Sequence, residues 1–160
     1  MIHLTNDAIQ KYGSNYGRYE EGNKISYAEF QRYLDQTMPD RKLSFYDSIY
    51  PKMREVARDA VRSAYLRMDP RRLQHNFEVF GLDFMIDQEF NVWLIEINTN
   101  PCLEISSGLL GRIIPTMVEH AFRLSLDVLF PPVAHYPNTQ KHLAPDNALD
   151  NLKFELIFDE

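Results

Sequence analysis

The sequence predicts an α+β fold in which one antiparallel β-hairpin is flanked by amphipathic helices. Two runs rich in aromatic and branched residues, 78–86 and 92–97, are separated by the polar linker 88–91. Apolar residues recur at three- and four-residue spacing in 48–68 and in 115–129. This spacing is typical of helices that bury one face.

A further helix is predicted over residues 26–36. Ser26 and Glu29 have the spacing of a capping box, in which each side chain bonds a backbone N–H of the first turn. The last helix is expected to begin at Pro115, because proline is favoured at a first helical position.

The hairpin brings oxygen-bearing side chains together. If the linker is a four-residue loop, Asp87 lies opposite Val92, and counting back places Asp83 opposite Glu96. Asn98 shares the face of Glu96 because side chains alternate along a strand. Two opposed carboxylates and an amide oxygen are ligands suited to Mg²⁺. Three apolar side chains are expected on the opposite face: Trp93, Ile95 and Ile97.

The alternative is a hairpin whose polar face is simply solvated. Against it, Asp83 interrupts the apolar run 80–86, and Glu96 lies within Trp-Leu-Ile-Glu-Ile. Carboxylates inside such runs are seldom buried unless they are paired or bind a metal.

The long helix carries a basic strip, defined as Arg54, Arg58 and Arg62, whose members are four residues apart and share one face. We expect either a docking strip for an acidic partner or a solvated face paired with Glu55 and Asp59.

Composition narrows the class of protein. The chain has 160 residues, a net charge of −6 and one cysteine, which argues against a disulfide framework. No apolar run is long enough to span a bilayer, and no nucleic-acid-binding module is recognisable. We therefore expect a cytoplasmic protein with no nucleic-acid or membrane partner.

Four motifs occur in an order that resembles the C-terminal half of the tubulin–tyrosine ligase family, which has an ATP-grasp fold. They are His3-Leu4-Thr5-Asn6, Asn15-Tyr16-Gly17-Arg18-Tyr19-Glu20-Glu21-Gly22-Asn23, Phe80-Gly81-Leu82-Asp83-Phe84-Met85 and Trp93-Leu94-Ile95-Glu96-Ile97-Asn98-Thr99-Asn100-Pro101.

The resemblance implies an enzyme that uses ATP and Mg²⁺ to join an amino acid (Tyr, Glu or Gly) to a protein carboxylate, usually on the acidic tail of tubulin, through an acylphosphate. Asp83, Glu96 and Asn98 match the family's metal ligands. Thr5 and Asn6 match residues beside the nucleotide phosphates, although they could instead cap the end of a strand. A cytoskeletal or ciliary location is implied as well.

The resemblance also gives a domain division. Residues 1–132 correspond to the C-terminal part of the ATP-grasp domain, and residues 133–160 are expected to be a C-terminal extension. The family's phosphate-binding lysines and adenine pocket precede the first motif, so we expect an incomplete domain without ligase activity when it is isolated. The alternative is a non-catalytic half-domain or degenerate paralogue that binds microtubules through its basic helix.

Overall fold

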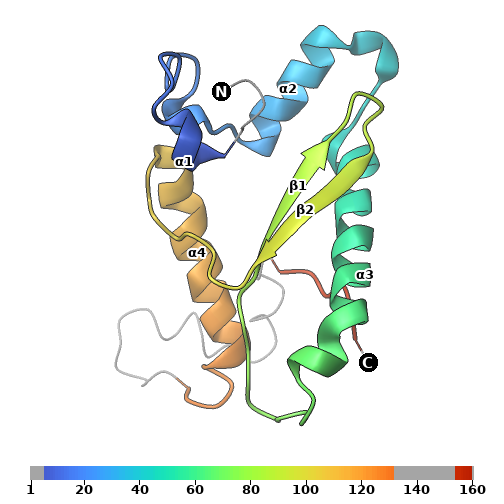
Figure 1. Ribbon diagram of the computed structural model, residues 1–160, viewed down its shortest axis with the longest axis vertical. Coiled ribbons are helices and arrows are strands. Elements are labelled where there is room, and N and C mark those ends of the chain that lie inside the picture. The colour runs from blue at the N-terminus through green and yellow to red at the C-terminus, as the bar shows by residue number, and fades with distance from the viewer. Residues whose placement is uncertain (1–5, 132–153, 160) are drawn as a thin grey trace. The chain divides into compact units, whose positions relative to one another are not determined.

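The computed structural model describes residues 6–131 and 154–159, which form two compact units. The first unit holds the described residues up to Pro51 together with Cys102–Ile114, and the second holds Lys52–Pro101 with the described residues from Pro115 onward. The regular secondary structure of the described residues consists of helices and one two-stranded antiparallel sheet (Figure 1), which confirms the α+β prediction.

The first unit is built around α1 (Asp7–Gln10) and α2 (Tyr27–Thr37). The predicted capping box of α2 is present: Ser26 Oγ accepts from the backbone N–H of Glu29, and Glu29 Oε2 accepts from the backbone N–H of Ser26 at 2.7 Å. Two short 3₁₀ turns flank α2, at Glu21–Asn23 and Pro39–Arg41.

Phe45 is the centre of the core of this unit. It is 1% exposed, its ring stacks on Tyr27 at 4.3 Å, and Leu34 and Ile49 are buried as well. The side chain of Gln31 accepts from the backbone N–H of Phe45 at 2.6 Å, which fixes the chain beyond α2 against that helix.

The chain then enters α3 (Tyr50–Met68) through a π-helical turn at Phe45–Ile49. The prediction of a helix over 48–68 is therefore confirmed to within two residues. In the second unit, Lys52 Nζ of α3 donates a 2.8 Å hydrogen bond to the carbonyl of Phe90 in the hairpin loop, so the start of α3 contacts the hairpin.

The hairpin consists of β1 (Gly81–Ile86) and β2 (Val92–Asn98). Residues 78–80, predicted as strand, precede β1 without being part of it. Gly81 lies where the chain passes close to Pro101, because a Cβ atom on Gly81 would come within 2.9 Å of the Pro101 Cβ.

The last helix, α4 (Gly108–Ser125), begins seven residues before the predicted start. Pro115 lies inside it, so the assignment of Pro115 to the first helical position was wrong. The N-cap is Ser107, whose Oγ accepts from the N–H of Leu110 at 3.2 Å. A proline interior to a helix removes one hydrogen bond, and α4 continues past that gap.

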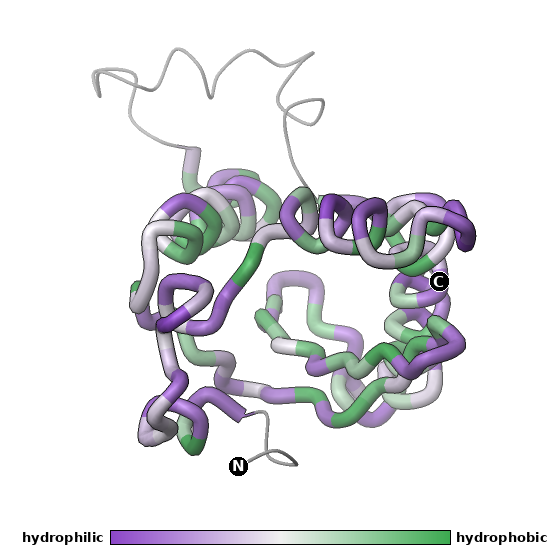
Figure 2. The backbone as a smooth tube through the Cα atoms, turned by 90° about the horizontal axis from the view of Figure 1, so that it is seen from above, coloured by the Kyte–Doolittle hydropathy of each residue, from purple (hydrophilic) through white to green (hydrophobic). Residues whose placement is uncertain are grey.

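Hydrophobic and hydrophilic residues alternate in short stretches along the described helices (Figure 2). The described helices include none whose length and hydropathy would allow it to span a bilayer.

Candidate functional site

The hairpin loop is organised by the carboxylate of Asp87. Its Oδ1 accepts from the backbone N–H groups of Glu89 and Asn91 at 3.0 and 2.8 Å, and its Oδ2 accepts from Trp93 Nε1 at 2.9 Å and from Asn91 Nδ2 at 3.0 Å. The bond from Trp93, followed by that from the Asn91 side chain, lowers the pKa of Asp87 to about 2. Phe90 takes a left-handed conformation (φ 62°), and the loop between the paired residues Ile86 and Val92 is one residue longer than predicted.

The predicted pairing of Asp87 with Val92 was therefore wrong, because Ile86 lies opposite Val92. A β-bulge then restores the register further along the strands. Phe84 pairs with Leu94, whereas Asp83 pairs with Glu96, which leaves Ile95 as the extra residue. The predicted pairing of Asp83 with Glu96 is confirmed.

Asp83, Glu96 and Asn98 form a cluster, which we call the hairpin cluster. The Nδ2 of Asn98 lies 3.3 Å from Asp83 Oδ2 and 3.3 Å from Glu96 Oε1. Both carboxylates are exposed, and Asn98 is half-buried. The cluster therefore presents two negative groups to one point in space, with an amide between them.

These residues fit a hard divalent cation. Asp83 and Glu96 supply two carboxylates, and rotation of the Asn98 amide by half a turn would bring its oxygen to the point that Nδ2 now occupies. Mg²⁺ prefers such ligands and completes its shell with water or substrate phosphates. Among the described residues no group of three His, Cys, Asp or Glu could hold a metal ion, so the fit depends on the amide as the third ligand.

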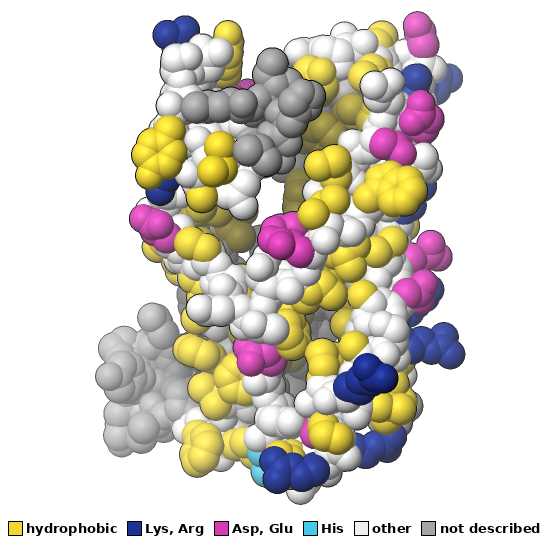
Figure 3. Space-filling view, in the orientation of Figure 1, with side chains coloured by type: hydrophobic (Ala, Val, Ile, Leu, Met, Phe, Trp, Pro, Cys, Tyr) yellow, Lys and Arg dark blue, Asp and Glu magenta, His cyan; other side chains and the backbone are white. Residues whose placement is uncertain are grey.

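The bulge also changes which residues share the face of the cluster. Trp93 pairs with Met85, two residues along β1 from Asp83, so Trp93 lies on the face of the carboxylates. The expectation that Trp93 points to the opposite face was wrong. Trp93 is 59% exposed and Met85 51%, which places an apolar surface beside the two acids. Hydrophobic side chains lie open among charged ones in the space-filling view (Figure 3).

A second polar cluster lies in the first unit, around the predicted nucleotide residues. Thr5 is outside the described residues. Asn6 is the N-cap of α1: its Oδ1 accepts from the N–H of Ala8 at 2.8 Å. The Asn6 oxygen thus caps the start of a helix, whereas the alternative drawn from the sequence was a cap at the end of a strand.

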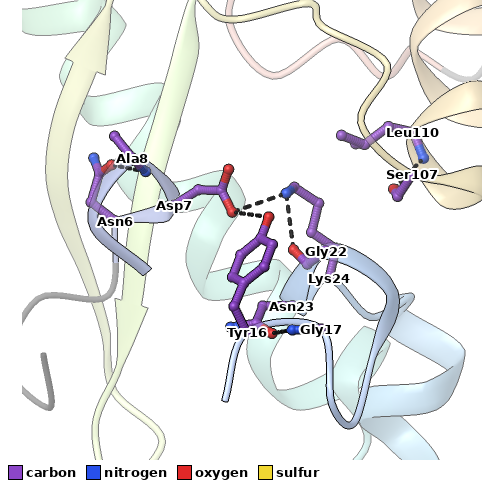
Figure 4. Close-up of polar contacts among 10 residues, drawn as sticks. All are labelled: Asn6, Asp7, Ala8, Tyr16, Gly17, Gly22, Asn23, Lys24, Ser107 and Leu110. Atoms are coloured by element: carbon purple, nitrogen blue, oxygen red, sulfur yellow. Dashed lines mark hydrogen bonds and ion pairs between the residues drawn. The ribbon is translucent and has the colours of Figure 1, made fainter. Parts of the chain in front are cut away.

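Asp7 follows Asn6 and joins Tyr16 and Lys24 (Figure 4). Its Oδ1 accepts from the Tyr16 hydroxyl at 2.9 Å and from Lys24 Nζ at 3.3 Å. The bond from Tyr16 and then the lysine lower the pKa of Asp7, and the same bond raises the pKa of Tyr16. Tyr16 belongs to one of the four sequence motifs, but the sequence patterns predicted no role for any of these three residues.

The motif that contains Tyr16 is held to the start of α4. Glu21 Oε2 accepts from the backbone N–H of Gly108 at 3.2 Å. At the start of a helix the N–H groups have no partner within the helix, and the helix dipole favours a negative group. Gly22 has a φ of 62°, a left-handed conformation that suits glycine. The glycine-rich stretch of the sequence is therefore an ordered loop of the first unit.

The basic strip lies on α3, where Lys and Arg side chains appear with acidic ones among them (Figure 3). Arg58 Nε lies 3.4 Å from its neighbour Asp59, in agreement with one pair of the solvated-face alternative. Arg54 Nη1 lies 3.2 Å from Glu155 of the C-terminal segment, a partner that neither alternative included.

The fold, the hairpin and the ordered loop agree with one family. The sequence model of the Tubulin-tyrosine ligase family matches residues 1–137, and the chain belongs to this family. It is 34% identical over 140 residues to Tubulin glycylase 3A of Drosophila melanogaster, covering 86% of this chain and 14% of that protein. It is 32% identical over 130 residues to Protein monoglycylase TTLL8 of Homo sapiens, covering 79% and 15%.

A third relative differs in its stated activity. Inactive polyglycylase TTLL10 of Homo sapiens is 29% identical over 128 residues, covering 78% of this chain and 19% of that protein. The chain thus spans less than a fifth of each of these relatives.

Proposed function

We propose that this chain carries the metal-binding part of an ATP- and Mg²⁺-dependent ligase that joins glycine to a carboxylate of tubulin. The observation that carries the proposal is the hairpin cluster, in which Asp83 faces Glu96 and both lie 3.3 Å from the Asn98 amide. Family membership supports the ligase class.

Each residue of the cluster has a role that follows from its charge. Asp83 and Glu96 supply the negative charge that attracts a divalent cation, and Asn98 adds a neutral oxygen. When bound, Mg²⁺ would neutralise charge on the phosphates during phosphoryl transfer. Asn6 has its oxygen committed to the helix cap, which leaves its amide hydrogens as the donors for a phosphate oxygen.

The proposed reaction has two steps. An oxygen of the acceptor carboxylate attacks the γ-phosphorus of ATP, and the bond to ADP breaks, which gives an acylphosphate. The amine of the incoming amino acid then attacks the acyl carbon; phosphate leaves, the amine loses a proton, and an amide remains. This chain's part is to hold the charged groups in place for the first step.

The proposal of glycine as the donor goes beyond what the motifs support, since they left Tyr, Glu and Gly open. Its support is that the two relatives with the higher identities above are both named as glycylases. Tubulin as the acceptor has support from the name of the Drosophila relative and agrees with the basic strip on α3. A cytoskeletal or ciliary location would follow from that acceptor.

The test is incorporation of labelled glycine into tubulin by the longest natural form of the protein, with labelled Tyr and Glu in parallel. Asp83→Asn and Glu96→Gln should each lower the rate on the order of 100-fold or more, as loss of a metal ligand does. Glu89→Gln, in the loop of the same hairpin, makes the same charge change and should keep the activity.

Activity near that of the wild type in Glu96→Gln would overturn the metal assignment. Incorporation of Tyr or Glu in place of glycine would retain the ligase and overturn the donor. No incorporation by the wild type would place the protein with the non-catalytic members, as the inactive human relative is named.

A further inference from the structure

The C-terminal segment Phe154–Asp159 lies against α3, within the same unit. It contacts the helix through Glu155, whose Oε2 is 3.2 Å from Arg54 Nη1. It also contacts it through Phe158, whose ring centroid is 5.2 Å from that of Tyr65 at an interplanar angle of 54°.

The exposure of the segment indicates which side chains hold it. Ile157 and Phe158 are half-buried, whereas Leu156 is 77% exposed. Arg54 and Glu155 are 44% and 48% exposed, so the ion pair is a surface pair of the kind that contributes little. The aromatic contact is therefore the anchor, and the ion pair sets where the carboxylate lies.

The chemistry of the segment matches the partner proposed for the basic strip. A glutamate-rich tail would offer carboxylates to the arginines, and the segment already places one carboxylate on Arg54. It contains Glu155 and Asp159 and no Lys or Arg, so its charge has the same sign as that of an acidic tail. An internal segment also has the high effective concentration of a tethered ligand.

We propose that Phe154–Asp159 is an internal competitor that occupies the Arg54 end of the basic strip and is displaced by acidic peptides. The inference rests on the proposed docking of acidic tails at this strip. A tail with several glutamates can engage Arg54, Arg58 and Arg62 together, whereas the segment engages Arg54 through Glu155. Displacement therefore favours a partner with several carboxylates over one with a single carboxylate.

The test is binding of a fluorescent glutamate-rich peptide to the 160-residue chain, followed by anisotropy. Phe158→Ala removes the anchor without changing the net charge and should tighten binding at least threefold. Glu155→Gln should tighten it as well, whereas Glu104→Gln, the same charge change in the other unit, should leave the Kd unchanged. A synthetic peptide of residues 154–160, added to a chain that lacks them, should compete with the labelled peptide.

Two results separate this inference from the proposed docking. If Arg54→Ser weakens peptide binding but Phe158→Ala and Glu155→Gln leave it unchanged or weaker, the competitor is overturned and the docking stands. If replacing all three arginines by serine leaves the Kd unchanged, the docking fails and the competitor with it. Thermal unfolding compares the stabilities of the variants that retain the segment. Competition by the synthetic peptide is a second readout, and it does not depend on those variants.

Discussion

Trp93 donates from its indole Nε1 to Asp87 Oδ2 at 2.9 Å, which ties the face of the hairpin cluster to the loop that joins the two strands. The same carboxylate accepts backbone N–H groups from Glu89 and Asn91. Because the chain contains one tryptophan, its indole signal reports on this hairpin alone.

The hairpin should keep its bonds to Asp87 down to a lower pH than the carboxylates of the unfolded chain would suggest. The pKa of Asp87 is lowered from 3.8 to about 2 in the fold, so its bonds stabilise the folded state fully above pH 4 and lose that effect as the pH falls toward 2. We expect the indole N–H resonance of Trp93 to shift with a midpoint near pH 2. Asp87→Asn should remove this titration and Glu89→Gln should keep it; a midpoint near pH 4 in the wild type would contradict the bonded geometry.

Gly81→Ala should destabilise the second unit by about 1–3 kcal/mol, since overpacking forces neighbouring atoms apart. The new Cβ would lie 2.9 Å from the Cβ of Pro101, and Asn98 is the residue paired with Gly81. Chemical denaturation measures the loss. Gly111→Ala is the matched control. Gly111 lies inside α4, and its new Cβ would meet Ile105 at an ordinary 3.5 Å, so the substitution should stabilise the helix by about 0.5–1 kcal/mol. Equal stabilities of the two variants would refute the close approach at Pro101.

Removing one carboxylate of the hairpin cluster should help the fold when no metal is present. Asp83 and Glu96 are directly opposed, and like charges across a strand pair are destabilising. In a chelator, Glu96→Gln is expected to unfold at the same or a higher temperature than the wild type. Added Mg²⁺ should raise the unfolding temperature of the wild type and leave the variant unchanged, because a ligand stabilises a fold only through binding. A variant less stable than the wild type in chelator would indicate a structural role for Glu96.

The basic strip should bind acidic peptides through charge. Replacing Arg54, Arg58 and Arg62 by serine should weaken binding of a glutamate-rich tail peptide roughly tenfold at low salt, because surface pairs contribute about 0.2–1 kcal/mol each. The salt dependence should flatten at the same time. Arg32→Ser, a charge change on α2, should have no effect on the Kd. Equal affinities of the triple variant and the wild type across salt would leave the strip as a solvated face.

The sequence predicted correctly that Asp83 lies opposite Glu96, although the predicted length of the hairpin loop was wrong. The loop takes in Asp87 and is one residue longer than expected, with Phe90 in a left-handed conformation, and the extra residue Ile95 then shifts the register back. The two shifts cancel at Asp83 and Glu96. In the stretch between the loop and the bulge the register stays shifted by one residue. This is why Trp93 was placed on the wrong face.

Other misses have local causes. Ser107 is an acceptable N-cap and Pro115 an acceptable first helical residue, so the local pattern does not choose between them. In the structure Ser107 Oγ accepts from the N–H of Leu110, and Pro115 lies inside α4. The contact of Glu155 with Arg54 joins residues 101 positions apart, which no local pattern reveals. By contrast, the capping box of α2 and the spacing of α3 depend on neighbours in sequence, and both were predicted.

A metal site at the hairpin cluster is tested most directly by a Mg²⁺ titration of the chain followed by residue-resolved NMR, with and without an ATP analogue. The hairpin cluster should bind weakly alone and more tightly with nucleotide, since phosphates complete the coordination of Mg²⁺. Shifts should concentrate at Asp83, Glu96 and the side-chain amide of Asn98, and Glu96→Gln should abolish them while Glu89→Gln does not. Shifts that spread evenly over the acidic surface, or that persist in Glu96→Gln, would contradict a metal site at this hairpin.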